Sequence, residues 1–158
     1  MKSRRLTPTT SLKAEYFNTT THDLFAYGSL MCPDIMAAVS TLAREGHQAV
    51  LPGYRRLLVR GEQYPAVIPA PDTSVTGVVY HDITAEGWAR LDRFEGVMYE
   101  RLPVTVTYDN GTTGKVCCYI FRPAFHERLT TENWSFDTFL QSGKMIFQQQ
   151  YGGFQELD

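Results

Sequence analysis

One glutamate in this sequence has neighbours that would suit acid and base chemistry. Glu95 lies in segment 91–101 (LDRFEGVMYER), close to Phe94, Val97 and Met98. Apolar neighbours raise the pKa of a carboxyl group, and a carboxyl with a pKa near neutrality can accept a proton and later return it. An ordinary surface glutamate paired with a nearby arginine would give the same local sequence. The segment therefore makes Glu95 a candidate general acid and base.

A short loop is the second candidate, and it consists of Tyr27, Gly28, Ser29 and Leu30. It follows the apolar run 23–27 (DLFAY) and precedes residues with helical spacing. Glycine has no Cβ, so a ligand can approach its backbone, and successive N–H groups in such a turn can hold a carboxylate or an oxyanion. The serine hydroxyl can add a further donor. An ordinary turn between a strand and a helix would have the same residues, so these four residues alone make the loop only a candidate for substrate binding.

The other reactive residue types show no pattern typical of a catalytic site. The four histidines and three cysteines lack metal-ligand spacing, so we expect no metal. Cys117 and Cys118 lie in an apolar run, which favours core packing, and the odd cysteine count favours free thiols in a reducing compartment. There is no nucleophile elbow, no phosphate loop and no dinucleotide fingerprint. We therefore expect no cofactor.

Apolar spacing and turn residues predict the elements that must position these candidates. We expect a strand over 23–27, a helix from Pro33 to Gly46, a section of short strands over 47–80, a helix from Thr84 to Gly96, a hairpin over 102–121 with its turn at 109–111, and a last helix from Ser135 that ends before Gly152. This order indicates an α+β domain whose sheet curls towards a barrel. We expect one domain over residues 23–158, preceded by a loosely ordered N-terminal arm over residues 1–22.

The composition argues against several classes of function. A chain of 158 residues with 43% apolar residues can form one domain with a substantial core, and a net charge of -2 does not suit nucleic acid or an anionic membrane. No apolar run approaches the roughly 20 residues that span a bilayer. Residues 1–22 lack the apolar stretch of a secretory signal, and a transit peptide is a weaker alternative. We expect a cytoplasmic protein.

Five motifs together resemble the gamma-glutamylcyclotransferase-like superfamily, in the branch of the plant avirulence-induced proteins and gamma-glutamylamine cyclotransferase. They are LFAYGSLM, GEQYPAVIP, VTGVVYHD, LDRFEGVMYERLPVTV and CCYIF, between residues 24 and 122. The resemblance implies a small mixed β-barrel with flanking helices, in which a loop faces a single glutamate across a cavity. It implies a catalytic role for Glu95. It implies substrate binding by Tyr27, Gly28, Ser29 and Leu30, with Tyr64 and Tyr99 as pocket-lining candidates.

The resemblance also implies a reaction, in which the α-amine of a γ-glutamyl amine or related compound attacks its own γ-carbonyl and releases 5-oxoproline. A non-catalytic barrel that binds a small metabolite is the alternative. The identity of the leaving amine is not determined by the resemblance, and a sugar-linked or peptide-linked amine is among the possibilities. The segment after Arg122 is longer than in the smallest relatives and could cover the pocket or pack against a second subunit, so both a monomer and a homodimer remain open.

Overall fold

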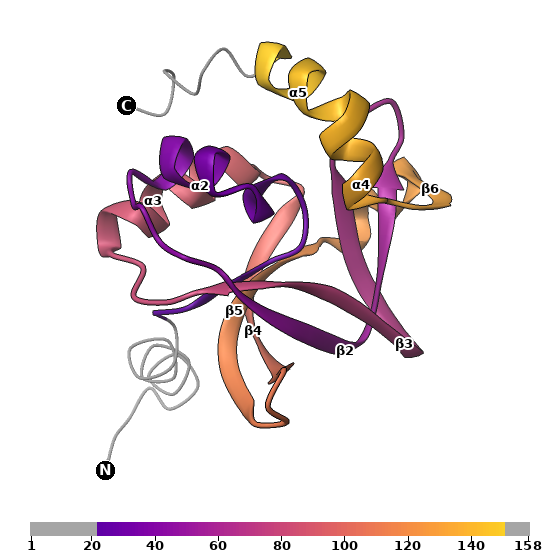
Figure 1. The fold of residues 1–158 in the computed structure, drawn as a ribbon. Coiled ribbons are helices and arrows are strands. Elements are labelled where there is room, and N and C mark those ends of the chain that lie inside the picture. Colours follow the sequence, from indigo (N-terminus) through magenta and orange to yellow (C-terminus); the bar gives the residue numbers. More distant parts are fainter. Residues whose placement is uncertain (1–21, 151–158) are drawn as a thin grey trace, which may run out of the picture.

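The computed structural model describes residues 22–150, and a closed mixed barrel forms its centre (Figure 1). The strands are β1 (Leu24–Ala26), β2 (His47–Val59), β3 (Pro65–Tyr80), β4 (Tyr99–Tyr108), β5 (Thr113–Phe121) and β6 (Leu129–Asn133). They pair in the order β3-β1-β5-β4-β2-β6, and an additional β3–β2 pairing closes the first five into a ring. β1 runs parallel to β5 and antiparallel to β3, while the pairings of β2 with β3 and of β4 with β5 are antiparallel. The expected α+β barrel is confirmed.

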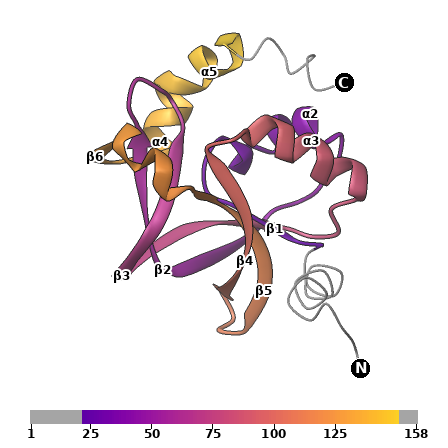
Figure 2. The same cartoon turned by 180° about the vertical axis from the view of Figure 1, so that it is seen from behind.

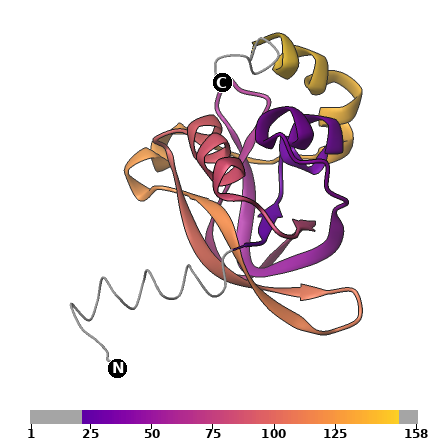
Figure 3. The same ribbon diagram turned by 90° about the vertical axis from the view of Figure 1, so that its left-hand side faces the viewer.

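Helices flank the barrel at the end opposite the β4–β5 hairpin (Figure 2). They are η1 (Ser29–Met31), α2 (Pro33–Ser40), α3 (Ala85–Glu95), η2 (Pro123–Arg128), α4 (Phe136–Thr138), the π-helical turn η3 (Phe139–Gly143) and α5 (Lys144–Gln150). α2 packs against α3, and α4, η3 and α5 follow one another as a single C-terminal helical segment (Figure 3). Both groups of helices lie over the end of the barrel at which β1 leads into the loop.

Strands β2 and β3 are much longer than the short strands expected over 47–80. They contain 13 and 16 residues, despite several prolines and glycines. The register shifts between Pro52 and Tyr54, where Gly53 has a φ of 84°. Pro52 pairs with Ser74 and Tyr54 pairs with Pro69, so the extra residues lie on β3, and an irregularity of this kind lets the paired strands bend and continue. The expectation of short strands was therefore wrong in length, although the section is β-structure as expected.

Helix α2 ends at Ser40, well before the expected stop at Gly46. The Ser40 hydroxyl donates to the Met36 carbonyl (2.7 Å) and accepts from the Leu42 N–H (3.1 Å). Thr41 then takes a left-handed conformation with a φ of 65°, which closes the helix. A serine that bonds to the backbone in this way competes with continued helix. The apolar spacing that reached Leu42 did not reveal this competition.

The other predicted helix starts and the hairpin turn are confirmed. The Thr84 hydroxyl accepts from the Gly87 N–H (3.0 Å), and the Ser135 hydroxyl accepts from the Thr138 N–H (3.2 Å). At the hairpin the Tyr108 N–H donates to the Thr112 carbonyl (2.8 Å). The predicted arm, apart from His22, and the predicted helix stop at Gly152 lie outside the described residues.

All three cysteines are buried free thiols, and Cys117 and Cys118 belong to two different hydrophobic clusters on opposite faces of β5, so both pack in the core as expected. Burial raises the pKa of the Cys117 thiol to about 11, which keeps it protonated at neutral pH. Between residues 22 and 150 the longest apolar helical stretch falls short of what a bilayer crossing requires.

Candidate active site

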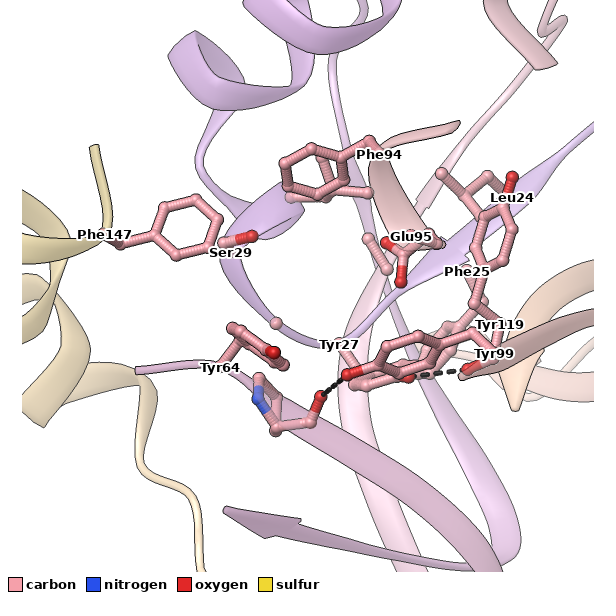
Figure 4. A pocket seen from close by; sticks show the side chains of 14 residues that line it. Leu24, Phe25, Tyr27, Ser29, Tyr64, Phe94, Glu95, Tyr99, Tyr119 and Phe147 are labelled. Atoms are coloured by element: carbon pink, nitrogen blue, oxygen red, sulfur yellow. Dashed lines mark hydrogen bonds between the residues drawn. The ribbon is translucent and has the colours of Figure 1, made fainter. Parts of the chain in front are cut away.

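A cavity of about 70 Å³ lies where the loop after β1 meets the end of α3 (Figure 4). Every residue that the sequence singled out as catalytic or substrate-binding lines this one cavity: Tyr27, Gly28, Ser29, Leu30, Tyr64, Glu95 and Tyr99. They come from four separate parts of the chain, namely the loop after β1, the β2–β3 connection, α3 and β4. The fold thus brings them together in space.

Glu95 is the last residue of α3, and Gly96 follows with a φ of 80° that turns the chain towards β4. Burial, with a further contribution from the charge of Asp92, raises the pKa of the Glu95 carboxyl to about 8. Within residues 22–150 this carboxyl has no hydrogen-bond donor and no cationic partner. Glu95 is therefore mainly neutral in the free protein at pH 7, and a cation that enters the cavity would favour its ionised form.

Asp92, one helical turn before Glu95, is held by two partners. The Tyr119 hydroxyl donates to Asp92 Oδ1 (2.7 Å), and Arg101 Nε lies 3.3 Å from the same oxygen. The Arg101 guanidinium also lies over the Trp88 ring at 4.4 Å. These contacts fix a second carboxyl group close to Glu95, where its negative charge opposes ionisation of Glu95.

The loop is shaped by a close approach between Gly28 and Pro65. A Cβ at position 28 would lie 2.9 Å from Pro65 Cδ, so the contact requires glycine. The loop carbonyls are occupied, because the Met31 N–H donates to the Gly28 carbonyl (2.9 Å) and the Tyr80 hydroxyl donates to the Leu30 carbonyl (2.6 Å). The N–H groups of Ser29 and Leu30 have no acceptor in the part of the chain that the structure describes. The loop therefore offers unused donors on a fixed backbone.

Besides Tyr119, whose hydroxyl donates to Asp92, two more of the cavity tyrosines use their hydroxyl protons within the protein. The Tyr27 hydroxyl donates to the Tyr119 carbonyl (2.6 Å), and the Tyr99 hydroxyl donates to the Pro65 carbonyl (2.9 Å), as Figure 4 shows. Burial raises the pKa of Tyr27 well above its usual value, so this side chain stays neutral. Tyr27 and Tyr99 thus shape the cavity and connect its walls to one another.

Seven further residues line the cavity that the sequence did not single out as part of the site: Leu24, Phe25, Ala26, Pro65, Phe94, Tyr119 and Phe147. Phe94 and Tyr119 lie on predicted elements, but the face on which each side chain lies depends on the tertiary packing. Phe147 comes from α5, and its ring contacts Phe94 and Tyr64 edge to face at centroid distances of 6.0 and 6.5 Å. The only signal for Phe147 was the apolar spacing of the last helix. The C-terminal segment therefore covers part of the pocket, which was one of the two roles left open for it.

The His, Cys, Asp and Glu side chains of residues 22–150 give no indication of a metal centre. No group of three or more His, Cys, Asp or Glu side chains with metal-binding geometry occurs among residues 22–150. The expectation of a metal-free site remains an expectation.

The fold is a closed mixed barrel with flanking helices. Its pocket brings a glutamate of raised pKa next to a glycine-containing loop, and these features agree with one known protein family. A family model described as "Gamma-glutamyl cyclotransferase, AIG2-like" matches residues 24–136, and the chain belongs to that family.

Curated relatives and a solved structure agree with this assignment. The chain is 37% identical to AIG2-like protein D of Arabidopsis thaliana over 61% of this chain and 64% of that protein, and 32% identical to AIG2-like protein C over 80% and 73%. The match to protein D thus spans slightly less than two thirds of that relative. A solution structure of an Arabidopsis thaliana protein has a TM-score of 0.65 and 28% identity, and covers 85% of this chain and 82% of that one.

Proposed function

We propose that this protein is a γ-glutamylcyclotransferase that cleaves a γ-glutamyl amine into 5-oxoproline and a free amine, with Glu95 as its acid and base. The observation that carries the proposal is the setting of Glu95. Its carboxyl group lines the same pocket as the loop, burial raises its pKa to about 8, and it has no hydrogen-bond donor or cationic partner among residues 22–150. A carboxyl group in this setting is ready to exchange protons near neutral pH.

The charges of a γ-glutamyl group find complementary partners in the pocket. Among residues 22–150, none that lines the cavity is Lys, Arg or His, so the substrate's α-carboxylate would bind the loop N–H groups of Ser29 and Leu30 and the Ser29 hydroxyl. The substrate's α-ammonium group would then lie beside Glu95. A nearby cation stabilises a carboxylate, so substrate binding itself would ionise Glu95 and produce the base.

The reaction then needs no nucleophile from the protein. Glu95 takes one proton from the α-ammonium group, and the neutral α-amine attacks the γ-carbonyl carbon to form a C–N bond. Glu95 returns that proton to the departing nitrogen, and the original amide C–N bond breaks as the carbonyl re-forms. The second proton of the new ring nitrogen passes through the Glu95 carboxylate to the released amine. The products are 5-oxoproline and an ammonium ion, and Glu95 ends ionised as it began.

The pocket can promote this ring closure by holding the substrate in a folded conformation. A well-oriented intramolecular attack has an effective molarity of about 10⁵–10⁸ M, which is a large share of an enzyme's rate acceleration. The close contact between Gly28 and Pro65 and the hydrogen bonds of Tyr27, Tyr80 and Tyr99 keep the pocket walls in place for this purpose.

The test is release of 5-oxoproline from a panel of γ-glutamyl amines, amino acids and peptides by wild type, Glu95→Gln and Glu100→Gln. Loss of a positioned acid and base should lower turnover about 10²–10⁴-fold in Glu95→Gln. Glu100 pairs with Arg122 at 3.4 Å outside the cavity lining, so Glu100→Gln should behave as wild type. Full turnover by Glu95→Gln would disprove the assignment. Binding of a γ-glutamyl compound without turnover by wild type would favour the non-catalytic barrel.

A further inference from the structure

The pocket has two chemically different ends. The Glu95 carboxyl group and the rings of Tyr27 and Tyr99 lie towards one side of Figure 4, and the rings of Tyr64 and Phe147 lie towards the other. Phe94 packs on Phe147, so it belongs to this second end. We call Tyr64, Phe94 and Phe147 the aromatic wall. The proposed reaction places the glutamyl group at Glu95, which leaves the aromatic wall for the other half of the substrate.

The three rings of the aromatic wall line the pocket and contact one another through Phe147. Phe147 meets both other rings edge to face and is almost fully buried, while Tyr64 and Phe94 are only partly buried. Behind Phe147 lies Phe139 at a centroid distance of 5.8 Å, so a second ring supports the wall from outside. Aromatic side chains that line a pocket and are packed against a further ring suit an apolar or aromatic ligand group. Such side chains bury the surface of the ligand group and allow stacked or edge-to-face contact with it.

The C-terminal helical segment that carries Phe147 is anchored beside the pocket on two sides. Lys144 Nζ lies 3.0 Å from Asp34 Oδ2 at the start of α2, and the Trp134 indole N–H donates to the Gln63 carbonyl (2.8 Å). The helix also approaches the chain before Tyr64 closely, because a Cβ on Gly143 would lie 2.8 Å from Gln63 Oε1. These contacts hold Phe147 in a defined position relative to Tyr64.

Charge in the pocket disfavours a leaving group that carries a carboxylate. The described part of the cavity lining contains no Lys, Arg or His, and the proposed function already assigns the loop N–H groups to the α-carboxylate of the glutamyl group. A second carboxylate at the aromatic wall would be desolvated without a cationic partner, which is costly. An amine without a carboxylate avoids this cost, whereas an amino acid or a peptide with a free C-terminus does not.

Building on the proposed function, we propose that the released amine is an aromatic or bulky apolar amine without a carboxylate, and that Phe147 and its neighbours in the aromatic wall select it. Phe147 lies beyond the residues 24–136 that the family model matches.

Three substrates that differ in one feature at a time test this inference. They are γ-glutamylphenethylamide, γ-glutamylethylamide, which lacks the ring, and γ-glutamylphenylalanine, which adds a carboxylate to the phenethyl group. We expect kcat/KM for the phenethylamide to exceed that for each of the others by about tenfold or more. The same order is expected for their dissociation constants from Glu95→Gln, measured by calorimetry.

Variants of the aromatic wall test whether its residues select the amine. In Phe147→Ala, kcat/KM should fall about tenfold for the phenethylamide and less than about twofold for the ethylamide. Ile146→Ala changes the neighbouring exposed residue of the same helix and should alter neither value. Thermal melting checks that each variant folds, and Phe94→Leu provides the same comparison with a smaller change if Phe147→Ala does not fold.

The outcomes separate this inference from the proposed function. If the phenethylamide binds best but no compound is turned over, the proposed function fails and the inference on ligand class stands. If turnover occurs but the ethylamide or γ-glutamylphenylalanine is preferred, or if the wall variants do not discriminate between substrates, the inference fails and the proposed function stands.

Discussion

Glu95 affects stability as well as chemistry, because its pKa is raised to about 8 by burial and by the charge of Asp92, from an ordinary value of 4.5. Below the lower value the carboxyl is neutral in both folded and unfolded chains and contributes nothing to pH dependence. Between the two values only the unfolded chain releases the proton, so the free energy of unfolding decreases as pH rises, and the loss is complete above about pH 8.

Replacing Glu95 with Gln should therefore stabilise the fold at alkaline pH. The melting temperature of Glu95→Gln should exceed that of wild type at about pH 9 and match it at about pH 4, where the wild-type carboxyl is neutral in both states. Melting curves over this pH range measure the difference, and Glu100→Gln is the control for a general change of charge. A variant that melts below wild type at about pH 9 would show that the carboxylate is stabilised in the fold.

The turn formed by the loop depends on the space that Gly28 leaves for Pro65. A Cβ at position 28 would displace either the loop or the proline ring, since the contact of 2.9 Å is shorter than van der Waals separation. The loop carries the donors proposed to bind substrate, so a small shift of its backbone would misplace the substrate relative to Glu95.

Gly28→Ala should therefore lower kcat/KM, by up to about 10²-fold for a displacement near 1 Å. Pro65→Ala removes the ring atoms that a Cβ would meet, so the double variant should recover part of the loss. Kinetics of the two single variants and the double variant measure this coupling. Equal losses in Gly28→Ala with and without Pro65→Ala would show that the contact does not govern the loop.

The sequence predicted those elements whose signals are local. Thr84 and Ser135 cap helices as expected, and the turn at 109–111 forms, because each depends on residues a few positions apart. The end of α2 and the length of β2 and β3 were missed, since both depend on how side chains and bulges use nearby backbone groups. Glu95 and the loop were recognisable from motifs. Phe147 was not identified as part of the site, because the helix that carries it reaches the pocket only through tertiary packing.

The barrel and the C-terminal helical segment share one hydrophobic core. Phe139 and Phe147 belong to the same buried cluster as Leu24 of β1 and Tyr99 of β4. Because each part buries apolar surface of the other, we expect the described residues to unfold as one cooperative unit.

The two tryptophans allow this cooperativity to be measured at separate places. Trp88 lies on α3 under Arg101, and Trp134 lies between β6 and α4 under Arg56. Fluorescence of Trp88→Phe reports the C-terminal side and that of Trp134→Phe reports the α3 side. In urea, the transition followed by fluorescence in each variant should coincide with the transition followed by far-ultraviolet circular dichroism of that same variant. If the fluorescence transition of Trp88→Phe preceded its circular dichroism transition, the C-terminal segment would be a separately unfolding unit.

The pocket combines residues of the barrel and α3 with one residue of the C-terminal helix. The glutamate and the loop belong to the barrel and α3, and Phe147 belongs to a helix that joins the site from outside the matched region. If the proposed function holds, substitutions in that helix after a gene duplication would alter which amine a copy releases, while the barrel stays under selection to preserve ring closure. Descendants of such a duplication should therefore diverge fastest around position 147 and slowest around Gly28 and Glu95.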